Sequence, residues 1–457
     1  MTAIPTDDRS SSGPARDERP GVVQQAGEQL GSLLALAVVS LLVGAASGLV
    51  GACFRLSLEW AERRREALIH WAHGESPGGF LLVPVTCATA TAVAAWLVRR
   101  FSPHASGSGI PHVEAVLNGE LPPAPFRLVP VKFLGGVLAI GSGQALGREG
   151  PSVQMAASLA HFLGKVSRRT WADCRVLMAA GAGAGLATAF NAPIAGAVFV
   201  LEELVRRFET RIAIAALGAS ATALWVARLL LGDTPEFRVE PLPPPGSEGL
   251  VLFVVLGVVA GLVAVAYNRA LLGAIAGANR LQRWPVELRA ALVGAAVGVL
   301  AWFAPELVGG GESLTQRTLS GKVMLSVLPL VFLLRFGLGA VSYAIRTPGG
   351  LFAPLLVLGA QLGLLFGALC RVVFPDLDMP PEAFAVVGMA AFFTGVVRAP
   401  VTGIVLIIEM TASFPMLLPM VGACFTALLV PTHLGNAPIY DSLRERPAPG
   451  ENDKKSS

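Results

Sequence analysis

One charged pair stands inside an apolar stretch of the chain, at a place where a carboxylate could do chemistry. Residues 143–157 read GQALGREGPSVQMAA, so Arg148 and Glu149 lie between two glycines and ahead of a proline. Proline suits the first turn of a helix, and glycine permits a sharp turn before it. A helix start carries free N–H donors and partial positive charge. An ionised carboxylate there can occupy an anion site, and a protonated one must leave it.

Two further segments share this glycine and proline pattern. GSGIP at 107–111 and TPGGLFAP at 347–354 also interrupt apolar runs. Each predicts a helix that begins within or near the membrane, and its N–H groups must then be buried in protein or line a cavity. Three such helix starts could enclose an anion that no lysine or arginine touches. The alternative is that these residues only kink helices or allow them to pack closely.

The elements that must position these segments are apolar helices. The chain has 457 residues, of which 53% are hydrophobic and 14% charged, whereas soluble domains are about a quarter charged. Apolar stretches of about 18 or more residues recur from position 31 to about 432, and each can cross a bilayer as a helix. We therefore expect an all-α polytopic membrane protein with roughly ten to twelve crossings.

Composition and motifs argue against several other classes of protein. The formal net charge of +4 is modest and implies no nucleic-acid partner. The five cysteines are scattered without a CxxC pair, so we expect neither a disulfide framework nor a metal site, and no cofactor is indicated. An intramembrane enzyme is the competing hypothesis. It lacks support, because the chain contains no GxSxG, no HExxH and no aspartate pair within an apolar run.

The polar and proline-rich segments divide the chain. We expect a polar, disordered tail over 1–30, a first membrane repeat over 31–232 and a proline-rich joint over 233–248. A second membrane repeat is expected over 249–443, and a polar tail over 444–457. The N-terminal tail lacks the apolar core of a secretory signal.

The two halves match each other in sequence. NAPIAGAVFVLE at 191–202 corresponds to RAPVTGIVLIIE at 398–409, with Ala-Pro, Gly and Glu at the same spacing. Further upstream, residues 147–164 stand where residues 346–363 stand in the second half. Internal repeats whose helices break at corresponding positions are typical of secondary transporters, with the site at the repeat interface. The sequence alone does not show whether the repeats are parallel or inverted.

The broken segments carry a specific family resemblance. GSGIPHVE (107–114), GREGPSVQ (147–154) and GGLFAP (349–354) resemble the three signature motifs of the CLC family of chloride channels and chloride/proton exchangers. NAPIYDSL, which contains Tyr440, resembles a fourth conserved element of that family. The resemblance covers roughly residues 33–445, and the chain ends too early for the C-terminal CBS domains of the long eukaryotic members.

The resemblance implies an architecture and a setting. Similar proteins are homodimers, each subunit having its own pore and two inverted-topology repeats with many broken and re-entrant helices. It implies that the substrates are chloride and protons. The chain resembles a short prokaryotic form, for which we expect a multi-pass location in the bacterial inner membrane.

The resemblance also assigns an anion site. It implies that the hydroxyls of Ser108 and Tyr440 bind chloride. The backbone N–H groups that would complete the coordination are those of Gly109, Ile110, Phe352 and Ala353. From the residues alone, Ser108 could instead be a helix cap, and Tyr440 could be a tyrosine of the interfacial belt.

By the same resemblance, Glu149 is the external gate and proton carrier, with Arg148 as a supporting residue. A salt bridge between the two is the alternative. Adjacent residues on a helix point apart, so that pairing is geometrically poor.

A second acidic pair follows the first matched segment. On sequence alone, Glu202 and Glu203 indicate a helix end at the cytoplasmic surface, with i,i+4 pairs from Glu202 to Arg206 and from Glu203 to Arg207. The resemblance instead aligns Glu203 with the internal proton-transfer glutamate of the exchangers.

The supporting residues of that second acid also come from the resemblance. It implies that Glu114 and Lys132 are its neighbours. Lys132 is a lone charge in an apolar segment, so a buried partner is expected. Glu409, the repeat partner of Glu202, is interpreted as a structural buried acid.

Two functions on this fold stay open. The first is chloride/proton exchange, which Glu203 favours, and the second is a passive, voltage- or pH-gated chloride channel. The serine in GSGIP favours chloride over fluoride by resemblance. His112, where the family more often has an acid, is assigned no role.

Overall fold

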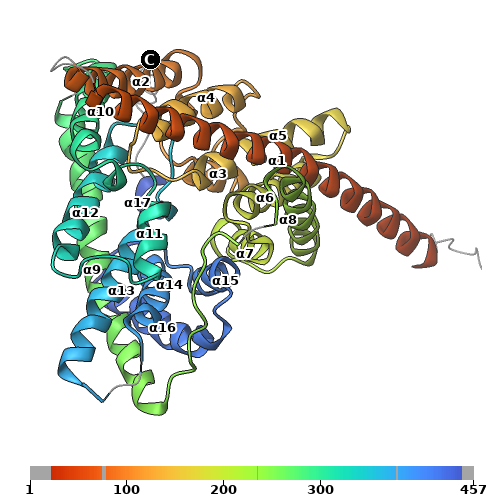
Figure 1. Cartoon of the computed structure of the whole chain (residues 1–457). Coiled ribbons are helices and arrows are strands. Elements are labelled where there is room, and N and C mark those ends of the chain that lie inside the picture. The colour runs from red at the N-terminus through yellow and green to blue at the C-terminus, as the bar shows by residue number, and fades with distance from the viewer. Residues whose placement is uncertain (1–21, 75–78, 234, 282, 377–378, 445–457) are drawn as a thin grey trace, which may run out of the picture.

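The computed structural model describes residues 22–74, 79–233, 235–281, 283–376 and 379–444 (Figure 1). Within these ranges the chain is almost entirely helical. The first half holds α1 (Val22–Gly74), α2 (Gly79–Phe101), η1 (Pro103–Ala105), α3 (Ile110–Leu117), α4 (Leu128–Gly141), α5 (Glu149–Val166), α6 (Trp171–Phe190), α7 (Pro193–Phe199), η2 (Val200–Leu204) and α8 (Thr210–Leu231).

The second half repeats this order of long, short and broken helices. It holds α9 (Ser247–Arg280), α10 (Val286–Phe303), η3 (Pro305–Leu307), α11 (Glu312–Leu319), α12 (Leu328–Ala344), α13 (Phe352–Val373), α14 (Pro381–Val397), α15 (Pro400–Thr411), η4 (Phe414–Met416), α16 (Leu417–His433) and α17 (Ile439–Arg444). From α1 to α8, each helix therefore has a counterpart between α9 and α16.

The two repeats are inverted with respect to each other. The counterparts α2 and α10 pack together through glycines, at which a side chain would collide with the opposite helix. Gly294 faces Thr91, whereas Gly298, one turn further along α10, faces Pro84, one to two turns back along α2. Counterpart helices that pack antiparallel identify an inverted-topology repeat.

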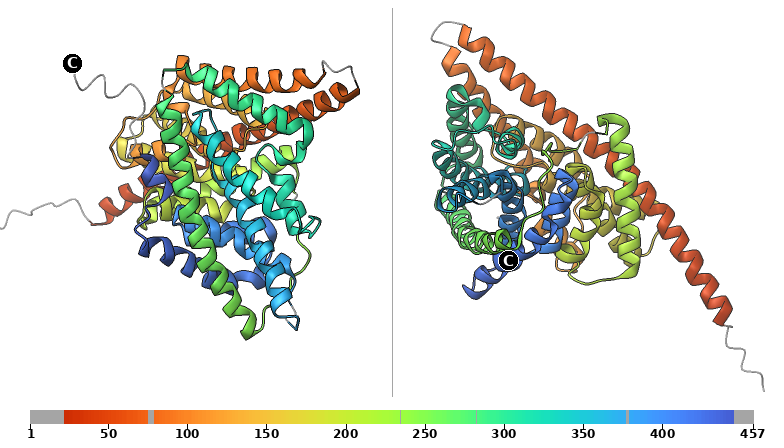
Figure 2. Two further views of the ribbon diagram at one scale, coloured as in Figure 1. Left: turned by 90° about the vertical axis from the view of Figure 1, so that its left-hand side faces the viewer. Right: turned by 60° about the horizontal axis from the view of Figure 1, so that its bottom comes forward.

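The lengths and apolar composition of the helices fit a membrane protein in which some crossing segments are broken. Among the described residues, seven helices are long and apolar enough to cross a membrane, and four apolar helices of 10–17 residues are shorter. The expected ten to twelve crossings thus correspond to fewer full-length spans, because several segments begin or end inside the molecule. Figure 2 shows α1 running past the body of the molecule along one side.

The core consists of helix pairs from corresponding places in the two repeats. α5 packs on α6, and α13 packs on α14. Gly181 and Gly185 of α6 approach the backbone of α5 closely, as Gly359 and Gly363 of α13 approach α14. Small residues allow such contact between membrane helices. The two helix pairs place the starts of α5 and α13 deep inside the protein.

The N-terminal boundary differs from the polar tail expected over 1–30. α1 begins at Val22 and runs without a break into its apolar part. Residues 22–30 contain no proline and consist mostly of residues that a helix accepts, so the helix continues upstream of the membrane segment. The preceding residues and the tail from 445 lie outside the described residues.

Candidate anion site and gate

Three loops that are far apart in the sequence meet at the centre of the molecule. Gly107 N–H donates to the Thr347 carbonyl at 3.2 Å, and Gly349 N–H donates to the Gly107 carbonyl at 3.1 Å. Gly147 and Gly350 exchange hydrogen bonds of 2.9 and 2.7 Å. These contacts join the segments that precede α3, α5 and α13. The three predicted helix starts therefore form one site.

The Glu149 carboxylate lies on the N-terminus of another helix. Its Oε1 accepts from Phe352 N–H at 2.6 Å and from Ala353 N–H at 3.4 Å, which are the first N–H groups of α13. The side chain is fully buried, and Oε2 has no hydrogen-bond partner among the described residues. The carboxylate thus occupies a position whose free donors and helix dipole suit any anion.

Two buried hydroxyls lie beside this position. Ser108 and Tyr440 are both fully buried, and neither hydroxyl has a hydrogen-bond partner among the described residues. The Tyr440 ring stacks near Phe352, with centroids 6.2 Å apart. Buried hydroxyls without a partner are costly, so each fits a donor directed at a bound anion. Burial of Tyr440 contradicts the interfacial-belt alternative, and Ser108 makes no side-chain helix cap.

The start of α3 lies against α5. Gly109 has a φ of 86° and is the cap residue of α3, so Ile110 N–H belongs to the first turn. A side chain at Gly109 would collide with Gln154, which explains why the turn requires glycine. A side chain at Gly150 would likewise collide with Ser108. His112 lies in the first turn of α3.

Lys132 supports the loop that carries Ser108. Its ammonium is fully buried and donates to the carbonyls of Ala105 at 3.1 Å and Gly107 at 2.6 Å. The expected buried partner is therefore a pair of carbonyl oxygens. No ion pair to Glu203 or Glu114 is found for Lys132 among the described residues.

A second buried acidic cluster forms where the end of η2 meets α3 and α17. Glu203 and Glu114 are both buried, and Arg206 joins them at 3.6 and 3.3 Å. Arg444 also contacts Glu114, at 2.8 Å. Asp441, next to Tyr440, completes the cluster through a 2.5 Å contact with Arg206. The structure thus brings Glu203 and Glu114 together, as the resemblance implied.

The expected i,i+4 pairs are absent from the described contacts. Arg206 pairs with Glu203, and Arg207 pairs with Glu209 at 2.5 Å. The helix ends with a π-helical turn at Leu204, and Arg206 has a left-handed φ of 55°. Regular i,i+4 spacing is lost there, so the sequence-based pairing was wrong.

Glu202 and Glu409 cap each other's repeat. Glu202 accepts from the N–H groups of Val401 (3.0 Å) and Thr402 (2.6 Å) at the start of α15. Glu409 accepts from Ile194 (3.1 Å) and Ala195 (2.7 Å) at the start of α7. The two counterpart helices therefore run antiparallel. Each carboxylate satisfies donors that a helix start leaves free.

Sequence reasoning missed several charged residues of the site. Arg444 and Asp441 lie close to Tyr440 in the charged run YDSLRER, which follows a long apolar stretch. Their nearness to a proposed site residue could have indicated that they belong to the site. Glu236 and Glu312, which contact Arg148, carried no such signal. They stand in the joint and at a helix start of the second repeat, far from Arg148 along the chain.

Fold and site together define a class. The molecule is a polytopic membrane protein of two inverted repeats, in which broken helices direct their N-termini at a buried anion position. That arrangement is typical of secondary transporters and related ion pathways.

The chain belongs to the voltage gated chloride channel family, which it matches over residues 90–432. It is 38% identical over 418 residues to the H(+)/Cl(-) exchange transporter ClcA of Vibrio cholerae (89% of this chain, 88% of that protein). It is 36% identical over 415 residues to ClcA of Vibrio parahaemolyticus (90% and 89%). A crystal structure of a slow cyanobacterial Cl-/H+ antiporter is similar, with a TM-score of 0.88 and 33% identity (91% and 99%).

Proposed function

We propose that this protein exchanges chloride for protons across the membrane, with Glu149 as the external gate. One observation carries the proposal. The Glu149 carboxylate occupies the N-terminus of α13, beside the buried hydroxyls of Ser108 and Tyr440, for which the described part of the chain supplies no hydrogen-bond partner. An acid that holds an anion position must leave it for chloride to enter, and protonation is the event that releases it. The similar Vibrio and cyanobacterial proteins are named as exchangers of these two ions.

Chloride binding uses neutral donors. Hydroxyls of Ser108 and Tyr440 and N–H groups at the starts of α3 and α13 supply the coordination, and Lys132 holds the Ser108 loop in place. Such donors cost no reorganisation when the ion arrives, because packed helices fix them. Neutral donors also let the ion leave, since no cation traps it.

Proton movement uses two acids on opposite sides of the anion position. Glu149 carries the proton on the external side, and Glu203 carries it on the internal side. Glu203 is buried, and its Oε1 lies 3.6 Å from Arg206 without a hydrogen bond. This environment allows it to change its protonation state without disrupting a tight pair. Glu114 and Arg206 tune the cluster.

The protein works as a homodimer in the bacterial inner membrane, with one anion path per subunit. The similar ClcA proteins come from bacteria, which supports this location. Each subunit holds a complete set of site residues, so exchange does not require a residue from the partner.

Proton pumping by a chloride gradient tests the proposal. Purified protein in liposomes loaded with chloride should drive protons against their gradient when the external chloride is diluted. A pH-sensitive dye and a chloride electrode record the two fluxes together. Protons that stay at equilibrium while chloride flows would contradict exchange, and a passive chloride channel would then be the function. Protein-free liposomes give the background.

A further inference from the structure

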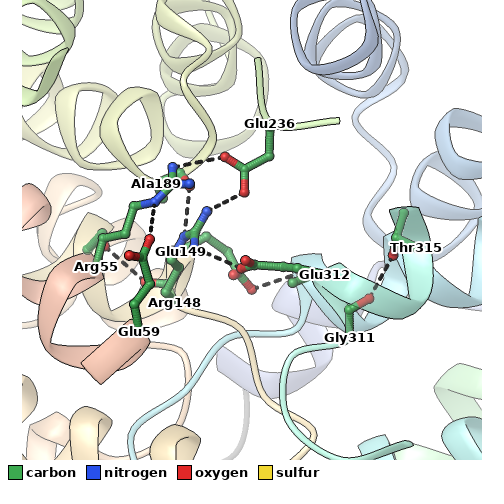
Figure 3. Close-up of polar contacts among 11 residues, drawn as sticks. Arg55, Glu59, Arg148, Glu149, Ala189, Glu236, Gly311, Glu312 and Thr315 are labelled. Carbon is green, nitrogen blue, oxygen red and sulfur yellow. Dashed lines mark hydrogen bonds and ion pairs between the residues drawn. The ribbon is translucent and has the colours of Figure 1, made fainter. Parts of the chain in front are cut away.

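The residue before the gate is held by three elements at once. Arg148 is the cap residue of α5, and its side chain is only 6% exposed. Its Nε donates to the Ala189 carbonyl at 2.9 Å, at the end of α6. The two terminal nitrogens contact the Glu236 carboxylate at 2.5 Å and the Glu312 carboxylate at 2.9 Å. Figure 3 shows both carboxylates directed at the Arg148 guanidinium.

Glu236 is itself fixed in place. It is almost completely buried, and its second oxygen accepts from Arg55 of α1 at 2.9 Å. Burial raises the pKa of Glu236, but the guanidinium groups of Arg148 and Arg55 outweigh burial and lower the pKa overall. The neighbouring Phe237 N–H donates to the Met410 carbonyl of α15. Glu236 therefore stays ionised on a backbone anchored to the second repeat.

Glu312 is positioned by the start of α11 and by the loop that precedes this helix. It is the first residue of α11, after Gly311, whose φ is 92°. The fully buried Arg335 donates to the carbonyls of Leu307, Gly309 and Gly310 at 2.8–3.1 Å and pins the loop ahead of it.

We propose that Glu236 and Glu312 form a carboxylate clamp on Arg148 that sets the position and charge environment of the gate Glu149. Glu236 is the principal positioning residue, because its contact is the shorter and the more buried. Glu236 belongs to the proline-rich joint between the repeats and contacts Arg148, which precedes Glu149. A movement of one repeat relative to the other is therefore transmitted to Glu149 through the Arg148 side chain. This inference rests on the proposed role of Glu149.

The clamp also balances charge beside the gate. Arg148 brings a positive charge next to Glu149, and the carboxylates of Glu236 and Glu312 balance the charges of Arg148 and Arg55. Arg55, Glu59 and Glu62 of α1 surround the far side of the clamp, and Tyr440 lies on the opposite side of the gate. Loss of a clamp carboxylate leaves the positive charge of Arg148 less balanced, which favours the ionised form of Glu149. Chloride entry then requires a more acidic external solution.

Chloride flux from liposomes, measured across a series of external pH values, tests the clamp. The pH of half-maximal flux should fall by about 0.5 to 1 unit in Glu236→Gln, because a charge in direct contact shifts a carboxyl by about 1 to 3 units and this one acts through Arg148. Glu236→Asp keeps the charge and should restore most of the wild-type profile. Glu306→Gln is the matched control, because it removes an acid from a half-exposed pair with Arg317. Its profile should match the wild type.

Two outcomes overturn the clamp. One is a Glu236→Gln profile that is unchanged or moves to higher pH, while Glu149→Gln flattens the profile. The other is pH dependence that survives in Glu149→Gln, since this removes the gate assignment itself. If Glu236→Gln cannot be purified folded, Glu312→Gln decides the question. Its carboxylate is 45% exposed, and it should shift the profile in the same direction by a smaller amount.

Discussion

At the scale of single residues, the gate is one carboxylate in an anion position. Glu149→Gln imitates the protonated side chain, which forms a weaker contact with the N–H groups of Phe352 and Ala353. We expect chloride flux to persist and its dependence on external pH to disappear, while proton transport falls to background. Dual recording of chloride and protons from liposomes measures both. Coupling that survives in Glu149→Gln would remove Glu149 from its role.

The internal acid makes a separate prediction. Glu203→Gln keeps the size and shape of the side chain but cannot carry a proton, so chloride flux should continue with proton transport at background. Glu209→Gln, which alters a partly exposed acid paired with Arg207, serves as the control and should behave as wild type. Normal coupling in Glu203→Gln would reduce Glu203 to a structural acid of the buried cluster.

At the scale of helices, Glu202 and Glu409 each cap the start of a helix in the other repeat and so link the two repeats. Glu202→Ala and Glu409→Ala each leave two backbone N–H groups of a helix start without a partner. Each should lower the free energy of unfolding by about 1 to 2 kcal/mol, in the range measured for lost N-caps. Thermal unfolding in detergent detects the change. Glu306→Ala, in a half-exposed ion pair, should change stability by less than about 0.5 kcal/mol.

A comparison of Glu202→Ala with Glu409→Ala adds a second test. Both variants should destabilise the protein, and Glu202→Ala should do so somewhat more, because each removes two backbone contacts and Glu202 also accepts from the Thr402 hydroxyl at 2.7 Å. If either variant unfolds at the same temperature as Glu306→Ala, then its carboxylate contributes no net stability at that helix start.

At the scale of the whole molecule, the proposed homodimer makes a prediction about mass. Detergent-solubilised protein should show a protein mass of twice the 47.4 kDa subunit, measured by light scattering with the detergent contribution subtracted. A mass of one subunit under conditions that preserve transport would contradict the dimer.

Local chemistry explains which parts were predictable. The starts of the helices at Glu149 and Phe352 follow from glycine and proline nearby, so their positions were visible in the chain. Apolar runs likewise indicated a membrane protein. The pairing of Arg206 with Glu203 was missed, because a π-helical turn and a left-handed residue broke the regular spacing.

The sequence by itself determined where helices begin inside the membrane, that the chain has two related halves, and which acid stands at an anion position. These properties depend on residues close together in the chain. Only the tertiary structure decided that the halves are inverted, that Glu202 caps Val401 and Thr402, and that Glu236 holds Arg148. The partners in those contacts lie 88 to 200 residues apart. Their meeting depends on the packing of helices and on no local pattern.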